Sequence, residues 1–540
     1  MGVYYQAFAD DVVLVFDGDS ALAIERCANA ALDQVRMWGI RNRLKFAPHK
    51  TCAMIVTRKL KHDTPRLSMG GVAIGMSDEM KLLGLTIDCK LTFDKHVANV
   101  CKKALNIYKQ LARAARVGWG LHPKVIQTIY TAAVEPVILY AAGAWSPAAS
   151  KLGIRRRLDS VQRGFSQKLC KAYRTVSLNS ALVLAGILPL DLRIKEAAAL
   201  YEAKKGFPRP ELGDREVELM APVIESPHPS LQSIILFGSL INQEQYNNSH
   251  HEVKIFTDGS KIEGKVGAAF SVWEEGIETR TIKLALPTYC SVYQAELLAL
   301  YRAVEHVLGH KSRDFGIYSD SMSALQTISN LGSTHPLAVK LRNTLRRTKL
   351  QYKSVSLYWI KAHVGLEGNE RADELAKEAA LRSKKKPDYD RCPISFLKRI
   401  IRMETLRLWE ERYKLGETAA ITKLFFPSAK DAHRIIKKIE INGYITQIMT
   451  GHGGFSSYLS RFKCKEDPSC ACEQGVEETV PHLIVSCPIF QQRRFDLEHE
   501  INTPITVENL QKIMISKNRD KFLKFCIEIV KKVIEKNKSD

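Results

Sequence analysis

The spacing of hydrophobic residues changes along the chain, and each change predicts a different element of secondary structure. Near the amino terminus, apolar residues on both sides of an acidic turn at 8–11 predict a strand, a turn and a second strand. Helical spacing follows over about 20–38, then a strand near 51–57 and a basic helix over about 93–116. Helical patterns continue to about residue 205.

Stretches rich in proline, glycine and polar residues interrupt this pattern twice, over 206–251 and over 382–388. Between them, strand-type runs come first and then alternate with helical ones. The segment after the second interruption is mostly helical and basic. A chain of 540 residues with this alternation predicts a multidomain α/β protein.

The charge of the chain narrows the class of its partners. The sequence has 80 lysines and arginines against 58 aspartates and glutamates, a formal net charge of +22. This basic excess favours a polyanionic partner, although on its own it also fits a membrane-surface or ribosomal protein. The chain has 12 cysteines, and only the four between 464 and 487 lie close together in the sequence. This is not the pattern of a disulfide-framed secreted domain.

Nothing in the sequence predicts secretion or a membrane partner. The amino terminus lacks a basic region followed by an apolar core, so it does not resemble a signal peptide. The most apolar stretch, 131–149, is interrupted by Glu135 and Pro136 and does not predict a membrane span. We therefore expect an intracellular protein, with nuclear and cytoplasmic locations equally open, because basic clusters such as 384–386 are also typical of solvated linkers.

Four carboxylates stand in local patterns that together suggest one reaction. Asp258 and Asp320 each end an apolar strand-type run, Glu296 lies inside an apolar helical pattern, and Asp373 lies ten residues after His363. Each alone has an ordinary explanation as a turn cap, a helix N-cap or a solvated helix charge. Carboxylates that converge repel one another and need cations, and Mg²⁺ suits such an all-oxygen site for in-line attack on a phosphodiester.

These residues resemble the signatures of the type 1 ribonuclease H family. The family's Asp-Gly-Ser, Ala-Glu-Leu, Ser-Asp-Ser and His-Val-Gly-x-x-Gly-Asn-Glu-x-Ala-Asp motifs occur in order, beginning at Asp258 and ending at Asp373. The resemblance covers 252–382 and implies a mixed five-stranded sheet with flanking helices. It also implies hydrolysis of the RNA strand of RNA–DNA hybrids with two Mg²⁺ ions, or Mn²⁺ in their place. The implied metal ligands are Asp258, Glu296, Asp320 and Asp373.

The same resemblance assigns roles around the metal ligands. His363, in a loop with two glycines, is expected to shuttle a proton or to assist product release. Selection of the RNA strand needs contacts to 2′-hydroxyl groups. Met322 stands where many relatives carry an amide side chain, so the contacts to the hybrid differ there. The candidates for substrate binding are Gly259, Ser260, Gln294, Ser321 and Asn369, the last of which is expected to order the loop near Asp373.

The amino-terminal turn, Phe-Ala-Asp-Asp at 8–11, resembles the catalytic hairpin of reverse transcriptases from non-LTR retrotransposons. Downstream segments resemble the following palm motifs and the thumb of jockey-like elements. The resemblance implies that Asp10 and Asp11 would bind Mg²⁺ and that Lys50 would act near the pyrophosphate. Two adjacent acids also cap tight turns, and the sequence lacks the earlier palm aspartate and the fingers. We therefore expect a vestigial polymerase site without activity.

A cysteine cluster in the last part of the chain has the ligand types of a zinc site. Cys470, Cys472, His482 and Cys487 offer three thiolates and an imidazole, which match a closed tetrahedral Zn²⁺ site. Buried reduced cysteines beside a core histidine are the alternative. The surrounding segments resemble the carboxyl-terminal region of the same retrotransposon polyproteins, which favours zinc. The basic neighbours suit binding of RNA or DNA, and a purely structural role is equally open.

The sequence therefore predicts a fragment of a non-LTR retrotransposon polyprotein that cleaves RNA in RNA–DNA hybrids. The alternatives are a non-catalytic nucleic-acid-binding remnant and a reverse transcriptase completed by a partner chain; the oligomeric state is not predicted. The expected regions are a truncated palm at 1–92, thumb or connection helices at 93–205, a linker at 206–251, the ribonuclease H domain at 252–382, and a helical region with the zinc site at 391–540.

Overall fold

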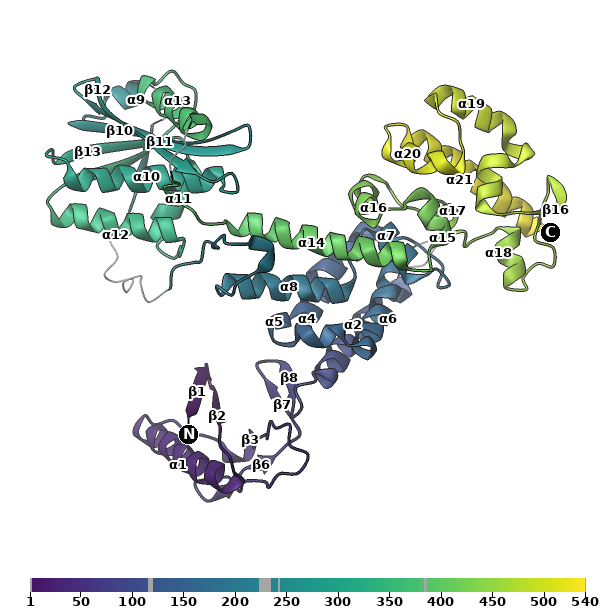
Figure 1. Cartoon of the computed structure of the whole chain (residues 1–540), viewed down its shortest axis with the longest axis horizontal. Coiled ribbons are helices and arrows are strands. Elements are labelled where there is room, and N and C mark those ends of the chain that lie inside the picture. The colour runs from purple at the N-terminus through teal and green to yellow at the C-terminus, as the bar shows by residue number, and fades with distance from the viewer. Residues whose placement is uncertain (1, 115–119, 223–234, 241–242, 383–385, 540) are drawn as a thin grey trace. The chain divides into compact units, whose positions relative to one another are not determined.

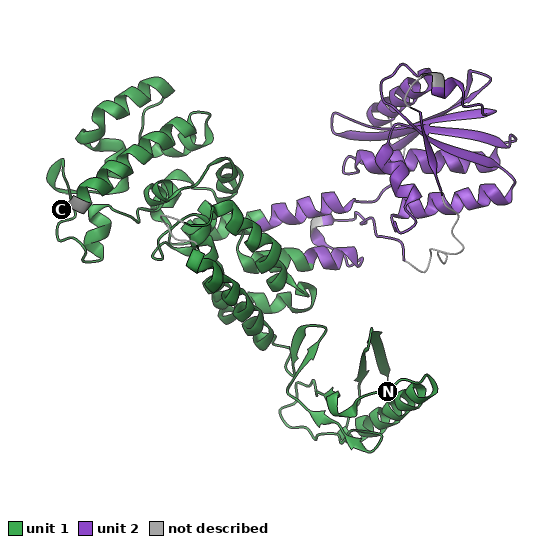
Figure 2. Cartoon of the chain, turned by 180° about the vertical axis from the view of Figure 1, so that it is seen from behind, with its two compact units in different colours: residues 1–198, 406–540 green, residues 199–405 purple. Residues whose placement is uncertain are grey.

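A computed structural model describes residues 2–114, 120–222, 235–240, 243–382 and 386–539 of the chain (Figure 1). The prolines at 227 and 229 and the lysines at 384 and 385 lie outside the described residues. The chain divides into two compact units (Figure 2). One comprises residues 1–198 and 406–540, and the other comprises residues 199–405.

The second unit is built on one mixed sheet of six strands, in the order β12-β11-β10-β13-β14-β9. Strands β10, β11 and β12 form an antiparallel meander, whereas β10 with β13, β13 with β14, and β14 with β9 pair in parallel. The sequence predicted five strands. The sixth, β9, comes from the segment predicted as a linker and pairs with β14 at the sheet edge. The strands are β9 (Phe237–Leu240), β10 (Val253–Ile262), β11 (Lys265–Glu274), β12 (Ile277–Leu286), β13 (Asp314–Ser319) and β14 (Ser354–Ile360).

Helices cover both faces of this sheet. Neighbouring residues of β10 point to opposite faces, and both faces carry apolar side chains that need to be buried. Ile255 packs into the cluster that contains Leu297 and Leu300, whereas Phe256 packs with Leu366 and Ala372. The first pair belongs to the helix α10, and the second pair lies at the start of α13. The helices of this unit are α9 (Gln243–Asn247), α10 (Val292–Gly309), α11 (Met322–Ser329), α12 (Pro336–Leu350) and α13 (Glu367–Arg382).

The first unit begins with the predicted strand, turn and strand, followed by the predicted helix. The strand predicted over 51–57 is much shorter, since only Cys52–Ala53 pairs, in parallel with Gly75–Met76. The remaining hairpins in this region are also short. The elements are β1 (Val3–Phe8), β2 (Asp11–Phe16), α1 (Ala21–Arg41), η1 (Pro48–Lys50), β3 (Cys52–Ala53), β4 (Ser68–Met69), β5 (Val72–Ala73), β6 (Gly75–Met76), β7 (Glu79–Leu82) and β8 (Leu85–Asp88).

The helices after residue 93 continue the first unit. The predicted basic helix is α2, and it packs against α6. The helices are α2 (Asp94–Ala114), α3 (Pro123–Ile129), η2 (Tyr130–Val134), α4 (Glu135–Leu139), α5 (Ala142–Trp145), η3 (Ser146–Ser150), α6 (Leu152–Leu169), α7 (Leu178–Ala185) and α8 (Leu190–Lys204), with the short turn η4 (Pro210–Leu212) beyond them.

The carboxyl-terminal region shares one hydrophobic core with the helices before residue 205, whereas the sequence predicts the two as separate regions. Arg412 donates to both oxygens of the buried Asp191, at 2.8 and 2.6 Å, and Thr422 donates to Ser180 at 2.8 Å. The elements of this region are α14 (Ile394–Leu415), α15 (Ala420–Phe425), α16 (Ala429–Ile435), η7 (Ile436–Lys438), α17 (Gly443–Thr450), α18 (Ser456–Arg461), β15 (Ser469–Cys470), β16 (Glu473–Glu477), η8 (His482–Ser486), η9 (Pro488–Phe490), α19 (Gln491–Ile501), η10 (Val507–Asn509), α20 (Leu510–Ile515) and α21 (Arg519–Ser539).

Within the described part of the chain, no single helix is long and apolar enough to cross a membrane. The bent pair Pro123–Leu139 and Ala142–Ser150 meets the criteria of length and composition only when its two members are taken together.

Candidate active site and cysteine cluster

Parallel pairing between two adjacent strands brings two of the predicted carboxylates together. Thr257 of β10 pairs with Ser319, the last residue of β13, so Asp258 and Asp320 follow at the same level. The sequence predicts that Asp258 ends its strand, but β10 continues to Ile262 because Asp258 and the residues after it pair with β11. Glu296 comes from α10, which packs across β10. One carboxylate oxygen from each of these three residues lies within 4.8 Å of the other two.

Two of the three carboxylates are buried and only partly satisfied by hydrogen bonds from the protein. Asp258 and Glu296 are each 7% exposed. Among the described residues, Oδ2 of Asp258 and Oε2 of Glu296 have no hydrogen-bond partner. Buried acceptors without a donor are costly, and a divalent cation satisfies several such oxygens at once. These carboxylates therefore fit a hard divalent metal ion.

The electrostatics of the site lead to the same conclusion. Burial, reinforced by the charges of Asp320 and Asp373, raises the pKa of Asp258 to about 7. Burial and the neighbouring Asp258 raise the pKa of Glu296 well above its ordinary value. Burial also raises the pKa of Asp320, partly offset by a hydrogen bond from the side chain of Asn369. Like charges in a dry site resist ionisation together until a cation joins them.

Gly259 allows the strand and the helix to meet at this point. A Cβ atom on Gly259 would lie 2.5 Å from the backbone nitrogen of Glu296, so only glycine fits. The backbone N–H of Gly259 also acts on both acids, lowering the pKa of Asp258 and of Glu296 against the larger effect of burial. The motif that begins at Asp258 thus contributes packing and hydrogen bonding as well as a carboxylate.

The predicted fourth ligand, Asp373, faces the same site but lies outside the group of three. Its carboxylate accepts a hydrogen bond from Nζ of Lys377, one helical turn later in α13, at 2.6 Å. The charge of Asp373 nevertheless contributes to the raised pKa of Asp258. Sequence reasoning missed Lys377, although a lysine four residues after an acid in a helix is a recognisable ion-pair spacing.

His363 lies in the exposed loop between β14 and α13 and has a positive φ of 55°. Its charge acts on Asp320, whose pKa it lowers against the dominant effect of burial. The indole N–H of Trp359 donates to the backbone oxygen of Asp320 at 3.0 Å and holds the end of β13 in place. The predicted catalytic residues from four separate motifs thus surround one location.

The predicted substrate contacts divide into two groups. Gly259, Ser260 and Ser321 adjoin Asp258 and Asp320 in the sequence, and Asn369 is buried beside Asp320. Gln294 does not fit its predicted role, because it is only 1% exposed and its side chain is bonded within the protein. It completes a capping box with Ser291 at the start of α10.

The cysteine cluster also forms a compact group of ligand atoms. One atom each of Cys470, Cys472, His482 and Cys487 lies within 4.8 Å of the others. The sulfur atoms of Cys470 and Cys487 are 3.8 Å apart, and Sγ of Cys472 lies 3.2 Å from Nε2 of His482. A tetrahedron with Zn–S bonds of about 2.3 Å has an edge of roughly 3.8 Å, so this spacing fits zinc. Burial, together with the neighbouring thiols, raises the pKa of Cys470 to about 12.

The residues predicted to form a vestigial polymerase site belong to neither group of candidate metal ligands among the described residues. Asp10 lies in the turn between β1 and β2, Asp11 begins β2, and Lys50 ends η1. All three are exposed to solvent. Their surroundings therefore lack the burial and the additional carboxylate that distinguish the other acidic site.

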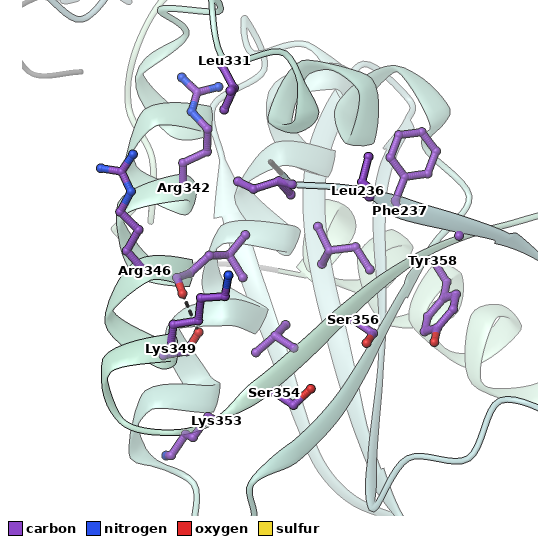
Figure 3. A pocket seen from close by; sticks show the side chains of 16 residues that line it. Leu236, Phe237, Leu331, Arg342, Arg346, Lys349, Lys353, Ser354, Ser356 and Tyr358 are labelled. Carbon is purple, nitrogen blue, oxygen red and sulfur yellow. Dashed lines mark hydrogen bonds between the residues drawn. The ribbon is translucent and has the colours of Figure 1, made fainter. Parts of the chain in front are cut away.

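A hollow of about 560 Å³ lies beside the sheet, between α12, β14 and β9 (Figure 3). None of the predicted metal-binding carboxylates lines it. Two of its basic residues serve the fold, since Lys353 donates to the carbonyls of Val307, Leu308 and His310 at the end of α10, and Arg342 donates to Asn330 at 2.9 Å. We therefore assign no catalytic role to this hollow.

Residues 250–381 match the ribonuclease H family model. The chain is 31% identical over 205 residues to a 115 kDa protein of the type-1 retrotransposable element R1DM of Drosophila melanogaster, covering 38% of this chain and 20% of that protein. A Pol polyprotein of the R1 4 element of Nasonia vitripennis is 26% identical over 216 residues, covering 37% of this chain and 55% of that protein.

A third relative is the RNA-directed DNA polymerase of the mobile element jockey of Drosophila melanogaster, 26% identical over 153 residues, covering 27% of this chain and 16% of that protein. The N-terminal ribonuclease H domain of a Mycobacterium tuberculosis protein, solved as a fusion with maltose-binding protein, matches with a TM-score of 0.21 and 20% identity, covering 24% of this chain and 94% of that one.

The chain spans between 16% and 55% of the lengths of these three polyprotein relatives. The family match covers all four predicted metal ligands and His363, and the relatives are R1-type and jockey-type elements. The chain is therefore a relative of non-LTR retrotransposon polyproteins and carries a ribonuclease H domain at residues 250–381.

Proposed function

We propose that this chain hydrolyses the RNA strand of RNA–DNA hybrids with the aid of two Mg²⁺ ions. The observation that supports this most strongly is the convergence of three carboxylates from separate elements, two of which are buried and have an oxygen without a hydrogen-bond partner among the described residues. A structural role does not account for this convergence, because the three groups repel one another and are costly to bury.

Each residue then has a defined task. Asp258, Glu296 and Asp320 would hold the metal ions, and Asp373, which is now paired with Lys377, would complete the site. Bound divalent ions lower the pKa of the attacking water and neutralise charge on the leaving oxygen. His363, in its exposed loop, moves a proton during attack or release of product. The net charge of +22 supports a partner with a phosphate backbone.

The test is cleavage of a hybrid with either strand labelled, with and without Mg²⁺. We expect cutting of the RNA strand only, and loss of cutting in Asp320→Asn. Glu275→Gln is a matched control, because Glu275 is an exposed acid in the turn between β11 and β12 of the same domain. Single-stranded RNA and duplex DNA complete the comparison. Absence of cutting by a folded chain that binds the hybrid would leave the non-catalytic binding protein as the better explanation.

We propose in addition that Cys470, Cys472, His482 and Cys487 bind one structural Zn²⁺ ion. The four ligand atoms lie close together, and Oγ of Ser486 lies 3.2 Å from Nδ1 of His482, where it can orient the ring. Because a structural zinc site contributes directly to folding, Cys472→Ser should lose the metal and lower the Tm of the first unit by several degrees. Metal content by mass spectrometry and a melting curve measure this, with Cys464→Ser, an exposed cysteine outside the group, as the control.

A further inference from the structure

Two segments outside the matched ribonuclease H region meet on its surface. We call residues 215–221 and 386–393 the strap. Their backbones pair, with the N–H of Glu218 donating to the carbonyl of Cys392 at 2.8 Å and the N–H of Cys392 donating to the carbonyl of Glu216 at 2.7 Å. The first segment continues to Ala221, whose N–H donates to the carbonyl of Thr334 at 2.8 Å.

The second half of the strap is bound to the element that carries Glu296. The carbonyl of Arg391 accepts a hydrogen bond from Nε2 of Gln294 at 3.2 Å, and the thiol of Cys290 lies 3.6 Å from the same oxygen. Asp388 exchanges hydrogen bonds with the backbone of Ala285 at the end of β12. The strap thus forms hydrogen bonds with residues just before α10 and with a residue in its first turn.

Glu218 is the buried charge at the centre of this arrangement. It is 4% exposed, its Oε2 lies 3.3 Å from Nε2 of His335, and Tyr389 donates to its Oε1 at 2.5 Å. Burial raises the pKa of Glu218, but hydrogen bonds from His335, Tyr389 and the side chain of Gln294 outweigh it and hold the pKa below its ordinary value. A carboxylate that stays ionised while buried needs hydrogen-bonding or charged partners of this kind.

The connection from Glu218 to the metal site is short. Nε2 of Gln294 donates to the carbonyl of Arg391, the residue before Cys392, and the carbonyl of Cys392 accepts from the N–H of Glu218. On its other side, Gln294 closes the capping box with Ser291. Glu296 is two residues further along the same helical turn. A metal-binding carboxylate must be held to within about half an ångström, and the groups that hold it are part of the site.

We propose that Glu218 is a positioning residue for Glu296, acting through Gln294, and that the strap belongs to the functional nuclease although it lies outside residues 250–381. This proposal rests on the proposed ribonuclease H function. It goes beyond it by adding a residue that touches neither metal nor substrate and by extending the catalytic unit on both sides.

The experiment uses the full chain and measures the affinity for Mn²⁺ by calorimetry without substrate, followed by the dependence of hybrid cleavage on Mg²⁺. We expect Glu218→Ala to weaken metal binding and to raise the Mg²⁺ requirement by about tenfold. The KM for the hybrid should stay unchanged. Glu218→Gln keeps an acceptor for Tyr389 and should restore most of the affinity. Glu216→Ala is the matched control, since it removes an exposed ion pair with Arg391 from the same strap.

The outcomes separate the two proposals. Equal metal affinity in wild type and Glu218→Ala, with both folded, overturns the positioning role whatever the chain cleaves. Weakened metal binding in Glu218→Ala without hybrid cleavage by the wild type supports the positioning role and overturns the nuclease function. If Glu218→Ala unfolds, Tyr389→Phe removes one hydrogen bond to Glu218 and should weaken metal binding in the same direction; an unchanged affinity in that variant also counts against the proposal.

Discussion

Two antiparallel strand pairs in this chain carry acidic residues, which are buried in one pair and exposed to solvent in the other. Asp258 on β10 is 7% exposed and lies within a group of three carboxylates. Asp10 and Asp11, between β1 and β2, are exposed, and neither joins a candidate metal group among the described residues. The local sequence is similar in kind, since each has an apolar strand that leads to an acid. The difference lies in what surrounds the strands.

The enclosure of the first site comes from distant parts of the chain. A helix that carries Glu296 crosses β10, a parallel strand delivers Asp320, and α13 closes the other face. The amino-terminal hairpin lacks such layers among the described residues, and Tyr5 and Phe8 are 81% and 65% exposed. Acids become a candidate metal site when the fold forces them together and away from water, because only then does a cation relieve their repulsion.

The largest effect is expected from Asp258→Asn, which removes one carboxylate of the enclosed site. We expect hydrolysis to fall by about a thousandfold, because several kcal/mol of metal-based stabilisation is lost. The same change should stabilise the metal-free fold, because it removes a charge that is costly to bury. Rate measurements and urea unfolding in Mg²⁺-free buffer test both effects. A variant that is both inactive and less stable would show that the carboxylate supports the fold.

The pH dependence of stability should differ between wild type and Asp258→Asn. The pKa of Asp258 is raised from 3.8 to about 7, so between these values the folded chain holds a proton that the unfolded chain has lost. The free energy of unfolding of the Mg²⁺-free protein should therefore fall as pH rises from about 4 to about 7, by at most about 4 kcal/mol from this residue. Urea unfolding from pH 4 to 8 measures it. Identical profiles in the two proteins would contradict the prediction.

A smaller effect is expected from Lys377, the cation that lies nearest to the enclosed site in α13. It pairs with Asp373 at 2.6 Å but is 46% exposed, so the pair contributes little to stability. Lys377→Met frees Asp373 and leaves the site more negative, and we expect about threefold tighter Mn²⁺ binding. Calorimetry measures this, with Lys265→Met, at the start of β11, as a control. Weaker binding would mean that Lys377 helps to organise the ligands.

The four acids could be predicted from the sequence because each sits in a motif whose local pattern is strong. It did not predict β9 or the strap, because both depend on pairing with residues far away in the chain. The structural role of Gln294 was also missed, although a local signal for it is present. Ser291 and Gln294 have the spacing of a capping box, which indicates that Gln294 serves the start of the helix.

The four residues predicted to bind zinc lie close together in the structure, and residue type and local spacing were enough to single them out as a group. The shared core of the thumb-like helices and the carboxyl-terminal region was not predicted, since hydrophobic helices do not reveal their partners. Contacts such as Arg412 with Asp191 join residues that are far apart in the sequence. Periodicity predicts which face of a helix is buried but not what covers it.

The smallest expected effect belongs to the exposed hairpin. The double variant Asp10→Asn and Asp11→Asn removes both acids of the vestigial polymerase site, and we expect hybrid cleavage within about twofold of wild type, since surface changes away from a site have little effect. Primer extension should be absent in both proteins, because two exposed carboxylates do not organise metal ions for nucleotidyl transfer. Extension by wild type that disappears in the double variant would reverse the comparison, since it would mean that a partner or the bound nucleic acid encloses the hairpin.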